Sequence, residues 1–312
     1  MTAPERTQAG PASVGSGTAY TLLAALGFAA VSTLTIIATG QHVALWNVLM
    51  WRYVLGSVML VSFVGARNYP RMPWREAARL IMIGGGGQAL FVGLALSSLQ
   101  YLTAATTAFL FYTYPAWVTL VQTVRGAERL TVRRLVVLAL SFGGVVVIKL
   151  FPVAGSFAKG VGLDLSMQAS RGVALALGAA VVYGIYIPTM QYLQKSHPVA
   201  VTSAYAKIGT AICFVLLAAG DGSLTFAMSA TAWEAILALT LFSTVLPSVF
   251  FLMGLMRLGP VRTAIVSTVE PFLTAILAAI VLRQAVTPNI LLGGAMIVAA
   301  VVVLQFRRER VA

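Results

Sequence analysis

Ten long apolar stretches follow one another along almost the whole chain, separated by short polar segments. Each is about as long as the roughly 20 predominantly apolar residues that a helix needs to cross the hydrocarbon core of a bilayer. Apolar residues occur on all sides of each stretch rather than at alternate positions, which favours helices over the strands of a membrane β-barrel. The sequence therefore predicts an all-α integral membrane protein with ten transmembrane helices. The predicted helices cover residues 17–39, 44–64, 77–98, 102–123, 132–150, 172–194, 200–219, 232–254, 262–282 and 288–306.

The composition agrees with a chain that lies almost entirely in the membrane. Hydrophobic residues make up 59% of the chain, charged residues only 9%, and the mean hydropathy is +0.92, whereas soluble domains carry roughly 25% charged residues. The longest connection, residues 151–171, is too short for a soluble domain. We therefore expect a disordered N-terminus at 1–16, helical units at 17–150 and 172–306, and a basic tail at 307–312.

The positive charges predict the orientation of the chain. An even number of helices places both termini on one side, and most of the 21 Lys and Arg residues lie in segments on that side. Because cytoplasmic loops are enriched in these residues, both termini are predicted to be cytoplasmic and the loop at 151–171 extracytoplasmic. The net charge of +13 then reflects topology and contact with anionic lipid. Its spread over several loops argues against binding to nucleic acid.

An internal duplication relates the two halves. Residues 102–147 align without a gap on residues 258–303, and Pro115 meets Pro271. The prolines weigh more than matched Val or Leu, because each lies in the middle of a predicted helix, where it removes a backbone hydrogen bond. Each half has five predicted helices, an odd number, so the second half must enter the membrane inverted. Two inverted five-helix repeats are an architecture of secondary transporters, whose substrate site lies near the midplane between the repeats.

The residues around these prolines resemble a known family. The segment YPA at 114–116, followed by GAERLT at 126–131, is similar to the "P…GE-L" signature of the drug/metabolite transporter (DMT) superfamily, EamA type. The segment VEP at 269–271 is similar to the family's "LEP" segment, although Gln284 stands where a second glutamate is usual. The resemblance implies ten helices in two five-helix repeats that frame a central cavity.

The resemblance also implies a function. The aromatic stretch FYTYPAW at 111–117 is similar to exporters of aromatic amino acids of the YddG type. This implies a secondary transporter of the bacterial inner membrane that exports amino acids with aromatic or other apolar side chains by alternating access. Export of other amphipathic metabolites or drugs is an alternative, as is a membrane-embedded enzyme or a channel. The implied partners are a small-molecule substrate and membrane lipid, with the chain a monomer or a homodimer.

Glu270 is the first candidate for contact with a substrate. It lies near the middle of a predicted helix, where a lone charge costs about 2.5–3.5 kcal/mol on insertion scales. Thr263 and Ser267 precede it at spacings that place all three on one helical face. Glu270 is expected either to contact a substrate or carry a proton, or to hold helices together near the bend at Pro271.

Arg52 and Lys207 are the other two charges within predicted helices, and they occupy corresponding helices of the two repeats. One interpretation is a pair that binds the carboxylate of a substrate. The other is that each reaches the membrane interface or holds a neighbouring helix end, because long basic side chains extend that far.

Further candidates form an aromatic, hydroxyl and amide lining that suits a small amphipathic solute. Aromatic residues in membrane helices also serve simply as packing residues, which is the alternative for each ring. The candidates are Gln88, Phe91, Phe111, Tyr114, Tyr183, Tyr186 and Ser243. Candidate points of helix bending are Pro115, Pro188, Pro247 and Pro271.

Enzymatic, metal and cofactor chemistry have little support in the sequence. His42 and His197 lie in connections on opposite sides of the membrane, so they cannot share a metal, and Cys213 is the single cysteine. HExxH, GxSxG and the ATP-binding GxxxxGK[ST] sequence are absent from the chain. We therefore predict neither catalysis nor a metal or cofactor.

Overall fold

The computed structural model describes residues 11–66, 72–124, 131–150, 167–193 and 197–305, and these residues form helices and short connections without a β-strand. The helices are α1 (Pro11–Thr39), α2 (Leu45–Ala66), α3 (Trp74–Arg79), η1 (Leu80–Gly85), α4 (Gly86–Ser97), η2 (Ser98–Gln100), α5 (Ala104–Phe111), α6 (Tyr114–Val124), α7 (Val132–Leu150), α8 (Met167–Leu193), α9 (Val199–Gly220), α10 (Ala230–Thr240), η4 (Leu241–Val245), α11 (Leu246–Ser267), α12 (Glu270–Val281) and α13 (Pro288–Gln305).

The all-helical membrane architecture is confirmed. Among the described residues, six helical segments are long and apolar enough to cross a membrane, and two shorter apolar helices follow at Glu270–Val281 and Pro288–Val303. α1 begins at Pro11, so residues 11–16, which the sequence predicted to be disordered, are helical. Residues 1–10, most of the loop at 151–171 and the tail at 307–312 lie outside the described residues, as does the segment at 125–130.

Two helices predicted to be continuous are interrupted. The predicted helix at 102–123 is divided into α5 and α6 at residues 112–113, and the helix at 262–282 is divided at residues 268–269. Pro115 and Pro271 explain both breaks. Proline has no backbone N–H to donate, and its fixed φ suits the first turn of a new helix, where each proline now lies. The two interruptions fall at matched positions of the internal duplication.

The connection predicted between the eighth and ninth helices is also helical, because α11 continues to Ser267. Arg257 supports this segment, since its guanidinium donates a hydrogen bond to the backbone oxygen of Met253 one turn earlier, at 3.2 Å.

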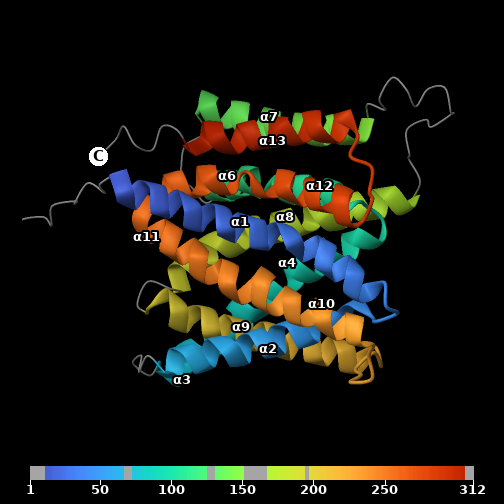
Figure 1. Cartoon of the computed structure of the whole chain (residues 1–312). Helices are drawn as coiled ribbons and strands as arrows, with labels where there is room; N and C mark the ends of the chain where they lie inside the picture. Colours follow the sequence, from blue (N-terminus) through green and yellow to red (C-terminus); the bar gives the residue numbers. More distant parts are fainter. Residues whose placement is uncertain (1–10, 67–71, 125–130, 151–166, 194–196, 306–312) are drawn as a thin grey trace, which may run out of the picture.

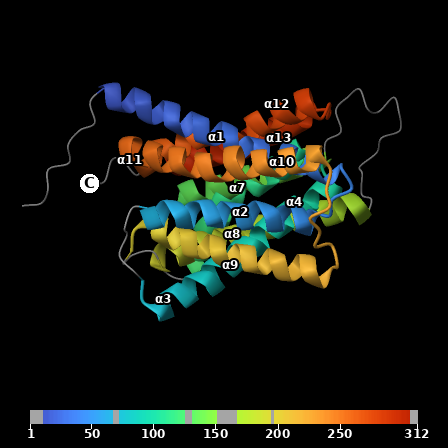
Figure 2. The ribbon, with the colours of Figure 1, turned by 60° about the horizontal axis from the view of Figure 1, so that its bottom comes forward.

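The two halves pack against each other reciprocally (Figure 1, Figure 2). α1 packs along α11, and α8, which corresponds to α1 in the second half, packs along α4. α2 packs on α9 and α7 on α13, and both pairs join corresponding helices. α5 packs on α12, and these two lie in the corresponding predicted helices at 102–123 and 262–282. In Figure 1, α1 begins and α13 ends at the same end of the bundle. Reciprocal contacts are the pattern expected of two similar units related by a two-fold axis.

Glycines allow the closest of these contacts. A Cβ atom added to Gly209 of α9 would lie 2.0 Å from the backbone oxygen of Ile81 in η1, and one added to Gly85 would lie 2.4 Å from the Cα of Gly209. Gly144 of α7 likewise meets the backbone oxygen of Gly293 in α13. Small residues let membrane helices approach backbone to backbone. The α9–η1 crossing therefore fixes the helices that carry Lys207 and Gln88.

Candidate functional site

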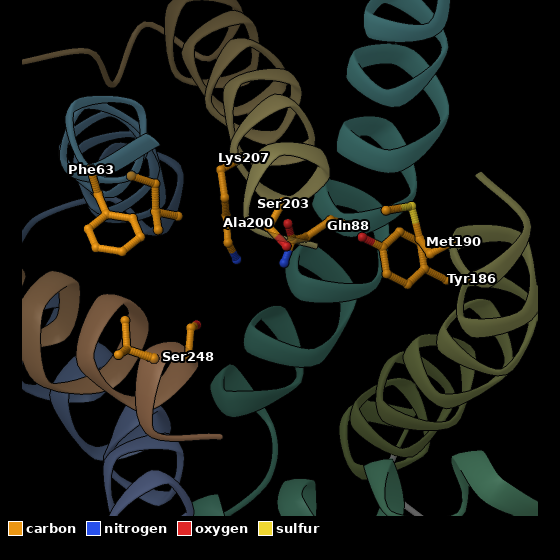
Figure 3. A pocket seen from close by; sticks show the side chains of 10 residues that line it. Phe63, Gln88, Tyr186, Met190, Ala200, Ser203, Lys207 and Ser248 are labelled. Carbon is orange, nitrogen blue, oxygen red and sulfur yellow. The ribbon is translucent and has the colours of Figure 1, made fainter. Parts of the chain in front are cut away.

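A cavity of about 180 Å³ lies between helices of both halves (Figure 3). α2 and α4 of the first half and α8, α9 and α11 of the second half form its walls. Three candidates from the sequence, Gln88, Tyr186 and Lys207, lie in its lining. The lining residues are Leu60, Phe63, Gln88, Tyr186, Met190, Ala200, Ser203, Lys207, Ser248 and Val249.

Lys207 and Gln88 bring polar groups to this cavity (Figure 3). The Nζ atom of Lys207 lies 5.0 Å from the centre of the Tyr53 ring, a cation–π contact. The side-chain oxygen of Gln88 accepts a hydrogen bond from the Thr210 hydroxyl at 3.2 Å. The same Thr210 hydroxyl lies 2.9 Å from the backbone oxygen of Ala206, so Thr210 holds the Gln88 side chain close to α9.

Arg52 lies close behind this wall. Its side chain is 6% exposed, its Nε atom donates to the Thr244 hydroxyl at 2.8 Å, and its guanidinium carbon lies 5.1 Å from the centre of the Tyr53 ring. These contacts favour the interpretation in which Arg52 holds a neighbouring helix, because the side chain is buried against η4 and bonds α2 to it. The Ser248 hydroxyl, which lines the cavity, donates to the backbone oxygen of Thr244 at 2.6 Å.

The predicted aromatic residues come together from α4, α5, α6 and α8 in one group, here called the aromatic cluster. Tyr183 is at its centre, and the centre of its ring lies 4.6 Å from that of Phe91, 4.8 Å from Tyr114 and 5.2 Å from Phe111. Tyr186, at 6.0 Å from Tyr183, joins the cluster to the cavity. The sequence alone could not show that these rings touch.

Glu270 lies on the other side of this cluster. Its carboxylate accepts a hydrogen bond of 2.8 Å from the hydroxyl of Tyr112, which also lies 3.1 Å from the backbone oxygen of Ser267. The Tyr112 ring contacts that of Tyr114. Glu270 is absent from the lining of the described cavity. Sequence reasoning missed Tyr112, whose one available signal was its place three residues before Pro115, within the aromatic stretch at 111–117.

Three hydroxyl candidates also lie away from the described cavity. Ser267 donates to the backbone oxygen of Thr263 at 2.9 Å, within its own helix, and Thr263 is buried. Ser243 is buried in η4, and its hydroxyl has no hydrogen-bond partner among the described residues.

The candidate hinge prolines lie at distinct backbone features. Pro188 is inside α8, and Pro247 is the second residue of α11, which follows the π-helical turn η4. Pro247 also packs tightly on α1, since a Cβ atom added to Gly27 would lie 2.3 Å from its ring. Pro115 and Pro271 follow the two helix breaks.

These features define a membrane protein of two similar halves with a cavity between them that polar side chains reach, and an aromatic cluster beside it. The chain belongs to the EamA-like transporter family, whose model matches it twice, at residues 15–150 and 170–306. The match confirms the resemblance and the two-repeat architecture.

Individual relatives agree with this assignment. The chain is 30% identical over 265 residues to the threonine/homoserine exporter RhtA of Escherichia coli strain K12, with 80% of this chain and 78% of that protein covered. The RhtA proteins of the O6:H1 and O157:H7 strains match to the same extent. A crystal structure of a protein 18% identical in sequence superposes with a TM-score of 0.65 over 95% of this chain and 98% of that chain, which supports the fold.

Proposed function

We propose that the chain is a secondary transporter that exports amino acids with aromatic or other apolar side chains. The observation that carries this proposal is the cavity between the two halves, where Lys207 and Gln88 offer polar groups and Tyr186 leads to the aromatic cluster. Polar groups suit the main-chain end of an amino acid, and rings suit its side chain. The name of the related threonine/homoserine exporter supports an amino acid as the substrate.

The size of the cavity favours an amino acid over a drug. Pockets for drug-sized ligands enclose roughly 300–1,000 Å³, and this cavity encloses about 180 Å³. A solute of the size of leucine or threonine is therefore a better match than a larger amphipathic compound.

The proposed mechanism is alternating access by ten helices in two inverted five-helix repeats. The reciprocal pairing of corresponding helices supports it, because two-fold related units can exchange conformations and so open the central site to either side. The helix breaks before Pro115 and Pro271 and the bends available at Pro188 and Pro247 are the proposed points of movement.

The aromatic cluster provides the first test of this function. Tyr183→Ala removes four ring contacts, and aromatic pairs contribute about 0.5–1.5 kcal/mol each beyond their buried area. The apparent affinity of this variant for L-phenylalanine and L-leucine, measured by efflux of the radiolabelled amino acids from preloaded cells, is expected to fall about tenfold. Gln88→Ala is expected to weaken efflux as well. Tyr192→Ala is the matched control, because Tyr192 is 73% exposed. Unchanged affinity in both the Tyr183→Ala and the Gln88→Ala variant would assign these residues to packing.

The proposed location is the bacterial inner membrane with both termini in the cytoplasm. In a Cys213→Ser background, single cysteines at Gln41 and Asp221, which are exposed between helices, are expected to react with an impermeant maleimide in sealed cells. A cysteine at exposed Arg75 is expected to react only after permeabilisation. If the cysteine at position 75 reacts in sealed cells, the predicted orientation is wrong and the termini are extracytoplasmic.

A further inference from the structure

Two cationic side chains share the ring of Tyr53. Arg52 from α2 lies 5.1 Å from its centre and Lys207 from α9 lies 5.0 Å from it. Among the described residues, no carboxylate lies within ion-pair distance of either cation, and the carboxylate of Glu76 pairs with His197 instead. Two positive charges therefore lie close together in a membrane-embedded region without a negative partner from this part of the chain.

Such an arrangement is unfavourable unless something compensates it. Removing a charge from water costs several kcal/mol after relaxation, and two like charges raise each other's energy. Ionisable residues within membrane helices accordingly pair with one another, with backbone carbonyls or with what passes along a transport path. In this chain the two cations occupy corresponding helices of the two repeats, at the interface that would open and close.

The hydrogen-bonding groups at this place are mostly donors. One terminal nitrogen of Arg52 is buried and has no hydrogen-bond partner among the described residues. Lys207 reaches the cavity, and so does the Gln88 amide, which carries two N–H donors. A group of donors with a positive charge is complementary to an anion with several acceptor oxygens.

We propose that Lys207 and Gln88 bind the carboxylate of the transported amino acid and that Arg52 is a positioning residue for this anion site. This inference rests on the proposed function and specifies how the cavity recognises its substrate. Lys207 supplies the direct charge. The positive charge of Arg52 adds to the electrostatic potential that attracts the anion. Its side chain also holds Thr244, whose backbone oxygen accepts a hydrogen bond from the Ser248 hydroxyl at the cavity wall.

This placement also orients the substrate. With the carboxylate at Lys207, the side chain of the amino acid extends toward Tyr186, which connects the cavity to the aromatic cluster. The carboxylate is then the common feature that the site selects. Compounds of similar size and apolarity that lack the negative charge are excluded.

The test compares carboxylates with the matching carboxamides on the purified full chain. In proteoliposomes, flux of L-leucine and L-threonine is measured in competition with unlabelled L-leucinamide and L-threoninamide. In parallel, the thermal stability of the protein is measured with 4-methylpentanoate and with 4-methylpentanamide, which requires no transport. The expected result is that the carboxylates compete and stabilise, and that the amides do so at least about 30-fold more weakly.

Substitutions of Lys207 test whether this residue binds the carboxylate. Lys207→Met keeps the length of the side chain and removes the charge, so it is expected to weaken carboxylate binding about 30-fold or more, whereas Lys207→Arg is expected to retain binding. Arg257→Met is the matched control, because Arg257 is absent from the cavity lining. Its guanidinium carbon lies 4.7 Å from the centre of the Tyr20 ring. If Lys207→Met does not fold, the comparison of carboxylates with amides in the unaltered protein still tests whether the cavity selects a carboxylate.

The outcomes separate this inference from the proposed function. Carboxylate-dependent stabilisation that disappears in Lys207→Met supports the anion site, even if no amino acid is transported, in which case only the proposed function fails. Amides that match carboxylates, or unchanged binding in a folded Lys207→Met protein, would overturn the anion site while leaving amino-acid export intact. Equal stabilisation by chloride at the same concentration would also overturn it, since the site would then not select a carboxylate.

Discussion

Gly209→Ala is expected to destabilise the protein severely. The added Cβ would lie 2.0 Å from the backbone oxygen of Ile81, 2.8 Å from its carbonyl carbon and 2.9 Å from the Cα of Gly85. All three are backbone atoms, so no side chain can rotate away and η1 must separate from α9. Overpacking typically costs about 1–3 kcal/mol, and this contact lies at the unfavourable end of that range. The measurement is the midpoint of thermal unfolding in detergent, followed by size-exclusion chromatography.

The same substitution also tests how the cavity is held together. Gly209 lies two residues after Lys207, and Gly85 lies three residues before Gln88, so separating these helices moves both ligand-facing groups apart. Gly86→Ala is the matched control, because Gly86 is adjacent to Gly85 but has nothing within 4 Å of the added Cβ. It is expected to be as stable as the original protein, or more stable, since alanine is favoured in helices by about 1 kcal/mol. A Gly209→Ala protein as stable as Gly86→Ala would show that the helices do not cross at this contact.

Glu270→Gln is expected to abolish gradient-driven export while leaving binding and exchange intact. Glu270 lies at the break between α11 and α12 and faces Tyr112 at the break between α5 and α6, away from the described cavity. The amide of the variant still presents an oxygen to the Tyr112 hydroxyl, so the contact between the two breaks is expected to remain. What the variant loses is the exchangeable proton and charge. The measurement compares flux driven by a proton gradient with exchange at equal pH.

Other results would assign Glu270 a different role. If Glu270 binds the ammonium of the substrate in another conformation, affinity in Glu270→Gln falls sharply, because truncating one partner of a buried charge pair costs about 2–5 kcal/mol. If the contact is only structural, Tyr112→Phe is expected to lower stability by about 1–3 kcal/mol, with transport per folded molecule unchanged. Glu234→Gln, which alters an exposed carboxylate on α10, is the control. Wild-type flux and pH response in a stable Glu270→Gln protein would eliminate both functional roles.

Hydropathy predicted the helical fold well because the membrane imposes one dominant constraint on the sequence. A helix satisfies its own backbone hydrogen bonds in lipid, so long apolar stretches identify it without tertiary information. The breaks at residues 112–113 and 268–269 were missed, because two unwound residues leave no trace in a hydropathy pattern. Pro115 and Pro271 indicated where the helices could bend, but not that each helix would divide into two. The helical start at Pro11 was missed because Ser and Gly made that segment resemble a disordered tail.

The candidate site was predictable in its residue types and less so in its contacts. The sequence named the rings as candidate lining of a cavity, but their contacts with one another depend on how four different helices pack. Tyr112 could not be assigned to Glu270 from the sequence, since the hydrogen bond joins residues from different repeats. Arg52 was similarly ambiguous, because only the packing of the helices shows that its Nε atom donates to Thr244. Spacing along one helix determines a face, but a contact between helices depends on their crossing.

Transport by the purified chain tests the central claim most directly. Proteoliposomes preloaded with unlabelled L-phenylalanine, L-leucine or L-threonine are exposed to the same amino acid in radiolabelled form, and the label that accumulates inside is identified. The account predicts saturable accumulation of unmodified amino acid that competitors suppress and that protein-free liposomes lack. Conversion of the label into another compound, flux that does not saturate, or the absence of accumulation with every amino acid would contradict it.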